Sequence, residues 1–109
     1  MKKIKPEGVV IPLVTPFTSD GKIDEGGTER LIEQVVRHDC HPFVLGTTGE
    51  SLSIPIESKM AYMRMANKAN ADRKTFYAGI SGMCEEESIM MGKNFADEGA
   101  DILVAHLPS

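Results

Sequence analysis

The segment Gly46–Ser51 (Gly-Thr-Thr-Gly-Glu-Ser) combines groups that can bind a small anion. Gly46 and Gly49 allow close backbone approach and unusual dihedral angles. Thr47 and Thr48 add hydroxyl groups, and converging hydroxyl and backbone N–H donors can hold a carboxylate without an arginine. The segment is not a Walker A loop, because no lysine follows the second glycine, and it lacks the dinucleotide-binding pattern Gly-x-Gly-x-x-Gly. Taken in isolation, Gly-Thr-Thr-Gly fits a tight structural turn better than a binding site.

The elements that must position this segment alternate between strands and helices. Short apolar runs predict strands at about residues 9–14, 43–45, 75–80 and 101–105. The first run is nearly continuous, so we expect that strand to be buried on both faces. Helical periodicity and end signals, such as a cap at Asp24 and a proline at position 55, predict helices between the strands. These helices are expected at about residues 24–39, 55–71 and 85–99.

The resulting β-α-β-α-β-α-β order is typical of parallel strands joined by right-handed crossovers. Two α/β architectures use it, an open doubly wound sheet and a (β/α)8 barrel, and in both the loops after the strands form the active face. The segment 46–51 is therefore expected on that face. A complete barrel takes about 250 residues, so in the barrel interpretation the 109-residue chain is a fragment whose first and last strands leave open edges.

Composition and charge exclude several classes of protein. Hydrophobic residues make up 41% and charged residues 26% of the chain, which is an ordinary globular composition. The formal net charge of −4 argues against nucleic-acid binding. No apolar run is long enough to span a bilayer, and the basic N-terminus leads into no signal peptide. We therefore expect a cytoplasmic protein that binds neither nucleic acid nor membranes, with Cys40 and Cys84 as free thiols.

Histidines supply two further candidates. His38 and His41 lie close to Cys40 in the sequence, but a structural zinc site needs a fourth ligand and none is apparent, so we expect no metal. Both histidines are instead expected near a helix C-terminus, where positive charge is favourable. His106 follows the fourth expected strand on the active face, where a histidine could bind substrate or move protons. The equal alternative is that His106 faces the surrounding helices.

The combination of these motifs resembles the dihydrodipicolinate synthase / N-acetylneuraminate lyase family. The segment 46–51 follows the second strand, and Pro12–Phe17 (Pro-Leu-Val-Thr-Pro-Phe) lies on the first. The segments 78–82 (Ala-Gly-Ile-Ser-Gly) and 99–101 (Gly-Ala-Asp) also fall where that family places its third strand and the entry to its fourth. The resemblance covers essentially the whole chain. It implies a (β/α)8 TIM barrel, with residues 1–109 as the N-terminal half of a single domain, and a homo-oligomer, which in the family is usually a tetramer.

The resemblance also implies an activity. Members of the family are class I aldolase-type lyases or synthases, and they form a Schiff base with pyruvate or another 2-oxo acid, in some cases with an aldehyde as second substrate. They need no metal or organic cofactor. By this resemblance Thr48 would bind the carboxylate of the 2-oxo acid, and Thr47 would relay protons to a tyrosine after the fifth strand. Gly46 and Gly49 would shape the loop, and Glu50 would be a structural acceptor.

The Schiff-base lysine on the sixth strand and the catalytic tyrosine have no match and would lie beyond Ser109, so the chain alone is expected not to form the imine. The sequence also departs from the family pattern within the matched region. Many relatives follow the fourth strand with Thr-Pro-Tyr-Tyr, where this chain has His-Leu-Pro-Ser at 106–109. Met83 and Pro55 also replace residue types common in relatives. These departures weaken an assignment to the lysine-biosynthesis synthase but leave the broader family intact. The rival interpretation is a truncated, non-catalytic relative that acts as a binding or interaction module through its open strand edges.

Overall fold

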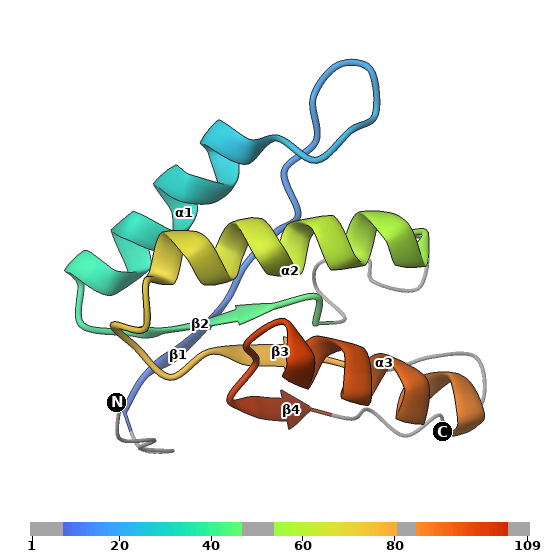
Figure 1. Cartoon of the computed structure of the whole chain (residues 1–109). Helices are drawn as coiled ribbons and strands as arrows, with labels where there is room; N and C mark the ends of the chain where they lie inside the picture. The colour runs from blue at the N-terminus through green and yellow to red at the C-terminus, as the bar shows by residue number, and fades with distance from the viewer. Residues whose placement is uncertain (1–7, 47–53, 81–84, 105–109) are drawn as a thin grey trace.

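A computed structural model of the chain describes residues 8–46, 54–80 and 85–104 (Figure 1). Within these residues the order of elements is β-α-β-α-β-α-β, as predicted. The strands are β1 (Val10–Pro12), β2 (His41–Val44), β3 (Tyr77–Gly79) and β4 (Ile102–Val104). The helices are α1 (Glu25–Arg37), α2 (Ile56–Asn70) and α3 (Glu85–Asp97). Each strand is shorter than its apolar run or offset from it, because pairing with neighbouring strands, and not hydrophobicity, decides where a strand ends.

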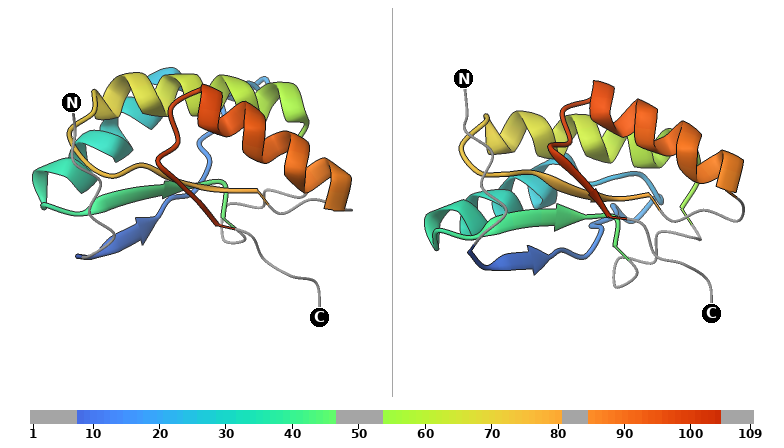
Figure 2. Two further views of the ribbon diagram at one scale, coloured as in Figure 1. Left: turned by 60° about the horizontal axis from the view of Figure 1, so that its bottom comes forward. Right: turned by 90° about the horizontal axis from the view of Figure 1, so that it is seen from below.

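The strands form a parallel sheet in the order β1-β2-β3-β4. Helices α1, α2 and α3 all pack on one face of this sheet (Figure 2). Every crossover therefore leads to the next strand in the same direction. A doubly wound sheet reverses its strand order and carries helices on both faces, so the strand order excludes that alternative. A sheet wound in one direction only is the geometry of a (β/α)8 barrel.

The expectation that β1 is buried on both faces is met on one face within the described residues. Leu13 is 6% exposed and belongs to the core under the helices, whereas Val14 is 58% exposed and Pro12 is also exposed. Alternate residues of a strand point to opposite faces, and within the described residues the helices cover only one of them. The apolar run therefore forms a strand with one face under the helices. No described element covers its other face.

The N-terminus of α1 forms as the sequence predicts. Asp24 is the N-cap residue, and its carboxylate accepts a hydrogen bond of 3.0 Å from the Gly27 N–H. The Thr28 hydroxyl donates to the Asp24 carbonyl at 2.8 Å. At the other end His38 is the C-cap, with its Nδ1 atom 2.8 Å from the Gln34 carbonyl oxygen. The cap and the apolar face of α1 are local features of the sequence, which is why they could be predicted.

His41 lies in a different place from the one expected. It is the first residue of β2 and not part of a helix terminus. Its ring Nδ1 accepts a hydrogen bond of 3.2 Å from the Thr75 N–H, which leaves the ring proton on Nε2 when the ring is neutral. The imidazole thereby ties the entry of β2 to the segment before β3. The sequence indicated a helix end near His41, but it did not indicate that His41 pairs with β1 as the first residue of β2.

The hydrophobic core lies between the sheet and the helices. Its members are buried apolar side chains contributed by strands and by all three helices. The largest that are fully buried are Tyr62, Phe76, Phe95, Ile32, Leu45, Met63 and Met91. Among the described residues no helix is long and apolar enough to cross a membrane.

Candidate active site

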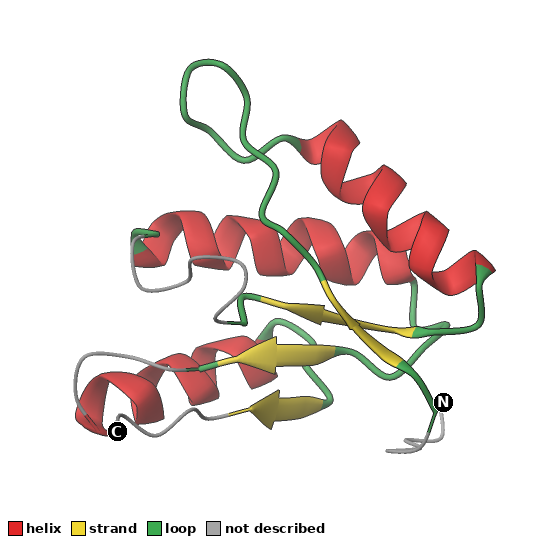
Figure 3. Cartoon of the chain, turned by 180° about the vertical axis from the view of Figure 1, so that it is seen from behind, coloured by secondary structure: helices red, strands yellow, loops and turns green. Residues whose placement is uncertain are grey.

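The candidate site lies at the carboxyl edge of the sheet, where all four strands end side by side. The register pairs Pro12 with Phe43, Val44 with Ala78 and Gly79 with Val104, so the strand ends are aligned. The strand arrows in Figure 3 show this common direction for β2, β3 and β4. In barrels wound in this sense, catalytic groups come from the loops at this edge.

Among the residues that the sequence predicts for the site, the structure describes only Gly46. It is buried and lies two residues beyond the end of β2, at the carboxyl edge. Thr47, Thr48, Gly49 and His106 lie outside the described residues, as does Glu50. Their proposed roles remain predictions from the resemblance.

Leu45 forms the turn that leads into the loop. Its φ is +60°, in the left-handed region that residues other than glycine seldom adopt. Its side chain is 1% exposed and belongs to the core. A residue in this conformation cannot continue the ladder, so β2 ends at Val44 and the chain leaves the sheet at Gly46. Backbone strain of this kind is concentrated at functional sites in proteins.

An aromatic ring packs closely against the Cα atom of Gly46, so a side chain there would require the ring to shift. A Cβ atom there would lie 3.1 Å from Cζ and 3.3 Å from Cε2 of Phe43. The Phe43 ring in turn contacts Tyr77, at 6.5 Å between ring centroids, and Tyr77 contacts His41 at 6.1 Å. These rings come from β2 and β3, and the Phe43 ring packs directly against Gly46.

Gly79 meets an even closer neighbour, which the sequence analysis did not identify. A Cβ atom at Gly79 would lie 2.3 Å from the carbonyl oxygen and 2.9 Å from the carbonyl carbon of Leu45. The backbone of the turn therefore crosses directly over Gly79. A glycine inside a strand indicates close backbone approach, but the sequence alone does not show which segment approaches.

Tyr62 fixes the chain that follows β1. Its hydroxyl, on α2, donates a hydrogen bond of 3.0 Å to the Val14 carbonyl oxygen. Burial raises the pKa of Tyr62 well above its usual range, so the group remains a protonated donor and is not a base. Tyr62 thus holds the β1 end of the carboxyl edge against α2 without itself serving as a proton acceptor.

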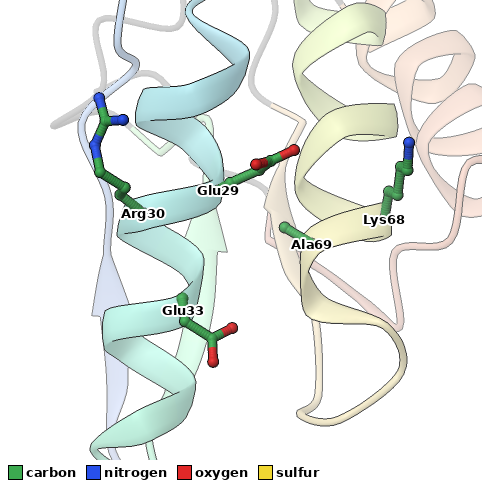
Figure 4. A pocket seen from close by; sticks show the side chains of 5 residues that line it. All are labelled: Glu29, Arg30, Glu33, Lys68 and Ala69. Atoms are coloured by element: carbon green, nitrogen blue, oxygen red, sulfur yellow. The ribbon is translucent and has the colours of Figure 1, made fainter.

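Two surface grooves lie away from this edge. One, of about 430 Å³, lies between α1 and α2, and Glu29 points from α1 toward α2 within it (Figure 4). Glu33 also lines it, and a hydrogen bond from Arg73 at 2.6 Å lowers the pKa of that carboxyl. The groove mixes exposed acidic and basic groups on the outer helical layer, so it does not resemble a catalytic pocket. The second, of about 400 Å³, is mainly apolar and lies between β1 and α1, where it is lined by Ile11, Leu13, Leu31, Gln34, Val35, His38 and Cys40.

The histidine and cysteine cluster of the sequence is divided among separate contacts. His38 caps α1, the Cys40 thiol donates to the His38 carbonyl oxygen at 3.4 Å, and His41 bonds Thr75. Cys40 is a free thiol, whereas Cys84 lies outside the described residues. Within residues 8–46, 54–80 and 85–104, no three side chains of the metal-binding types are grouped so as to hold an ion.

The fold defines the class of protein: this is a (β/α)8-barrel chain, and residues 1–109 supply about the first half of the barrel. The model of the Dihydrodipicolinate synthetase family matches residues 5–108. The chain therefore belongs to this family, as the resemblance of its motifs predicted.

Comparisons with single proteins agree with this family. A 4-hydroxy-tetrahydrodipicolinate synthase from Moorella thermoacetica is 37% identical over 101 residues, which are 92% of this chain and 35% of that protein. YagE, a prophage protein of the dihydrodipicolinic acid synthase family from E. coli K12 solved in complex with pyruvate, superposes with a TM-score of 0.85 at 30% identity, over 90% of this chain and 33% of that one. N-acetylneuraminate lyase from Mycoplasma synoviae gives a TM-score of 0.77 at 31% identity, over 88% of this chain and 34% of that one. The chain spans about a third of the length of the curated relatives that it matches.

Proposed function

We propose that this chain is the N-terminal part of a lyase or synthase that acts on pyruvate or another 2-oxo acid through a Schiff base. The observation that carries the proposal is the family match over residues 5–108, together with the position of Gly46 at the carboxyl edge of the sheet. The pyruvate bound to a relative of 30% identity supports the class of substrate. The particular member of the family is left open, because the synthase and the lyase relatives have comparable identity.

The proposed chemistry is a reversible aldol-type reaction. A lysine amine condenses with the 2-oxo group and releases water, which leaves an imine. Loss of a proton from the adjacent carbon gives an enamine, whose carbon attacks the carbonyl of an aldehyde, and hydrolysis then restores the amine and releases the product. Thr48 would hold the carboxylate with its hydroxyl and backbone N–H groups, and Thr47 would relay the proton. No metal or organic cofactor is part of this proposal.

The amine would come from a lysine outside this sequence. The described lysines lie in turns or on helices, and none is at the carboxyl end of a strand: they are Lys22, Lys59, Lys68, Lys74 and Lys93. Lys59 is the buried one, at 5% exposed, but it lies on α2 with its Nζ atom 3.6 Å from the Met91 sulfur of α3. That contact directs the Lys59 amine toward α3.

Borohydride trapping tests the imine. The product of the complete open reading frame is incubated with pyruvate and borohydride, and intact-mass and peptide analysis locate any adduct. We expect a permanent adduct on one lysine that is not among residues 1–109. A protein that is folded but gains no adduct with pyruvate or with other 2-oxo acids would refute the Schiff-base mechanism.

A second candidate function follows from the open edges of the sheet. Within the described residues β1 and β4 each pair on one side only, and such edges can accept a strand from another chain. A non-catalytic interaction module would therefore be a stable, self-associating product without any adduct. Reading the coding DNA past the Ser109 codon separates the two, because the enzyme requires an open frame that supplies a tyrosine and a strand-end lysine.

Two further statements belong to the proposal. We infer that the complete protein is a cytoplasmic homo-oligomer, a tetramer as is usual in the family, and that an aldehyde is its second substrate. Light scattering on the complete product measures the oligomer directly, and a monomer at micromolar concentration would contradict it.

A further inference from the structure

We propose that Gly79 is a positioning residue for the substrate-binding loop: by carrying no side chain, it lets the Leu45 carbonyl cross β3 and thereby sets where Gly46 leaves the sheet. The inference rests on the proposed function, because it concerns how the loop after Gly46 is aimed at the 2-oxo acid.

The register shows what Gly79 permits. Phe43 pairs with Tyr77 and Val44 pairs with Ala78, so a continued β2 would bring Leu45 opposite Gly79. Leu45 instead adopts its φ of +60°, and its carbonyl oxygen comes to lie where a Cβ atom of residue 79 would be, at 2.3 Å. That Cβ atom would also lie 3.2 Å from the Gly46 Cα atom. Even alanine at position 79 is therefore incompatible with this turn.

The strand β3 has little freedom to move away from the clash. Gly79 pairs with Val104 on its other side, and the Ile80 N–H donates to the Val104 carbonyl oxygen at 3.0 Å. Ala78, next to Gly79, is fully buried in the core. A methyl group at position 79 would therefore displace the Leu45–Gly46 backbone and not β3.

The opposite side of Gly46 is occupied as well. The Phe43 ring lies against Gly46, within 3.1 Å of a Cβ position there. The first residue of the loop is thus held between the Phe43 ring and the backbone of β3. Thr47 and Thr48, the residues proposed to contact the substrate, directly follow Gly46 in the sequence, so we infer that its position matters for binding. Small misplacements of binding groups cost large factors in reactivity.

The test compares two glycine-to-alanine variants of the complete product, Gly79→Ala and Gly92→Ala. Gly92 is a matched control on α3, because a Cβ there would lie 3.4 Å from Leu103 Cδ1, which is ordinary contact. The measured quantities are the pyruvate concentration that half-saturates borohydride trapping and the melting temperature.

We expect Gly79→Ala to raise the half-saturating pyruvate concentration by about tenfold or more, with trapping retained at saturation. Gly92→Ala should leave that concentration unchanged. A purely structural role would lower the melting temperature but leave half-saturation of the folded protein unchanged, and that result would overturn the proposal.

If Gly79→Ala does not fold, the double variant Gly79→Ala/Phe43→Leu decides the question. Removing the ring gives Gly46 room to retreat from residue 79, so the double variant should fold and still bind pyruvate weakly. Pyruvate binding equal to that of Phe43→Leu alone would overturn the proposal, and so would a double variant that fails to fold while Phe43→Leu folds. Absence of an adduct in the unmodified protein would instead refute the proposed function. Failure of the proposed function can therefore be distinguished from failure of the inference about Gly79.

Discussion

Tyr62 shows at the scale of one residue how a buried polar group organises the edge of the sheet. Its side chain is fully buried, and its only polar atom donates to the Val14 carbonyl oxygen. We expect Tyr62→Phe to lower the free energy of unfolding by about 1 kcal/mol, because the Val14 carbonyl loses its partner. Chemical denaturation of the complete product measures the loss. Tyr77→Phe is the matched control, since the structure gives the Tyr77 hydroxyl no hydrogen bond within the described residues, and an equal loss in both variants would contradict the prediction.

The same tyrosine predicts a pH dependence of stability. Burial raises the pKa of Tyr62 in the folded protein, whereas in the unfolded chain it is about 10. Above that value the unfolded chain releases the proton and the folded protein retains it, so the unfolding free energy falls as pH rises. Tyr62→Phe removes this contribution. We therefore expect the stability difference between wild type and Tyr62→Phe to shrink above about pH 10, and a constant difference between pH 8 and 11 would contradict it.

We expect substitutions of Thr47 and Thr48 to affect different steps of the proposed reaction. Thr48→Val removes the hydroxyl proposed to bind the carboxylate, a hydrogen bond to a charged group worth about 1.5–3 kcal/mol. The half-saturating pyruvate concentration should therefore rise by roughly ten- to a hundredfold. Thr47→Val should leave trapping of pyruvate nearly unchanged but slow turnover with the proposed aldehyde substrate, because it would interrupt the proposed proton relay. Equal effects of both variants on half-saturation would contradict the separate roles.

The part of the candidate site that could be predicted from sequence, and that the structure describes, is the position of Gly46 at the carboxyl edge of the sheet. Gly46 follows the second apolar run, and a loop after a parallel strand lies on the active face, so local pattern was sufficient. The turn that aims the loop could not be predicted. Leucine gives no sign of a positive φ, and the role of Gly79 depends on which backbone crosses it. Both properties arise only when β2 and β3 pair.

At the scale of elements, the first turn of α1 offers two adjacent glycines in different environments. A Cβ on Gly27 would lie 2.9 Å from Oδ2 of the capping Asp24, whereas a Cβ on Gly26 would meet only the mobile end of Arg30, at 3.3 Å, and Asp24 Oδ1, at 3.7 Å. Gly27→Ala should therefore disturb the cap, and loss of an N-cap costs about 1 kcal/mol, so this variant should be about 1 kcal/mol less stable than Gly26→Ala. Gly26→Ala should be neutral or stabilising by up to about 1 kcal/mol, because alanine is the better helix former.

The cap prediction has an internal check. If Gly27→Ala acts by displacing the Asp24 carboxylate, its cost should be absent from an Asp24→Ala background, where the cap is already lost. Thermal unfolding of the single and double variants measures the coupling. Additive losses would show that Gly27→Ala acts elsewhere, for instance against Pro16, whose Cβ lies 3.2 Å from the same position.

The order of elements and most helix boundaries followed from local signals. Asp24 caps α1, Pro55 precedes α2, and α3 begins at Glu85, each as the residue types predict. Strand boundaries were less accurate, and β2 begins at His41, ahead of the predicted run. Helix ends are encoded by neighbouring residues, whereas strand ends depend on partners distant in the sequence.

At the scale of the whole molecule, the strand order decides between architectures that the sequence left open. Both alternatives use the same β-α alternation, so periodicity could not separate them. In the described part of the chain, three successive crossovers run in one direction and place their helices on one face, which excludes the doubly wound sheet. The second face of the sheet carries half-buried and exposed side chains such as Phe43 and Pro12. In a (β/α)8 barrel that face is filled by side chains of the other strands.

The second face of the sheet, which no described element covers, predicts how residues 1–109 behave when they are produced alone. Val14 is 58% exposed just beyond β1, a strand that within the described residues pairs on one side only, and an apolar groove of about 400 Å³ lies between β1 and α1. Open edges and apolar surface favour association, so we expect this segment to self-associate or to unfold readily, as light scattering over a concentration series and thermal unfolding would show. Val14→Lys should reduce the association, because it places a charge beside the edge, whereas Met90→Lys, at a position 62% exposed on α3, should not. A segment that is monomeric and stably folded at all concentrations would contradict the prediction and would mean that four strands with one covered face suffice for an independent fold.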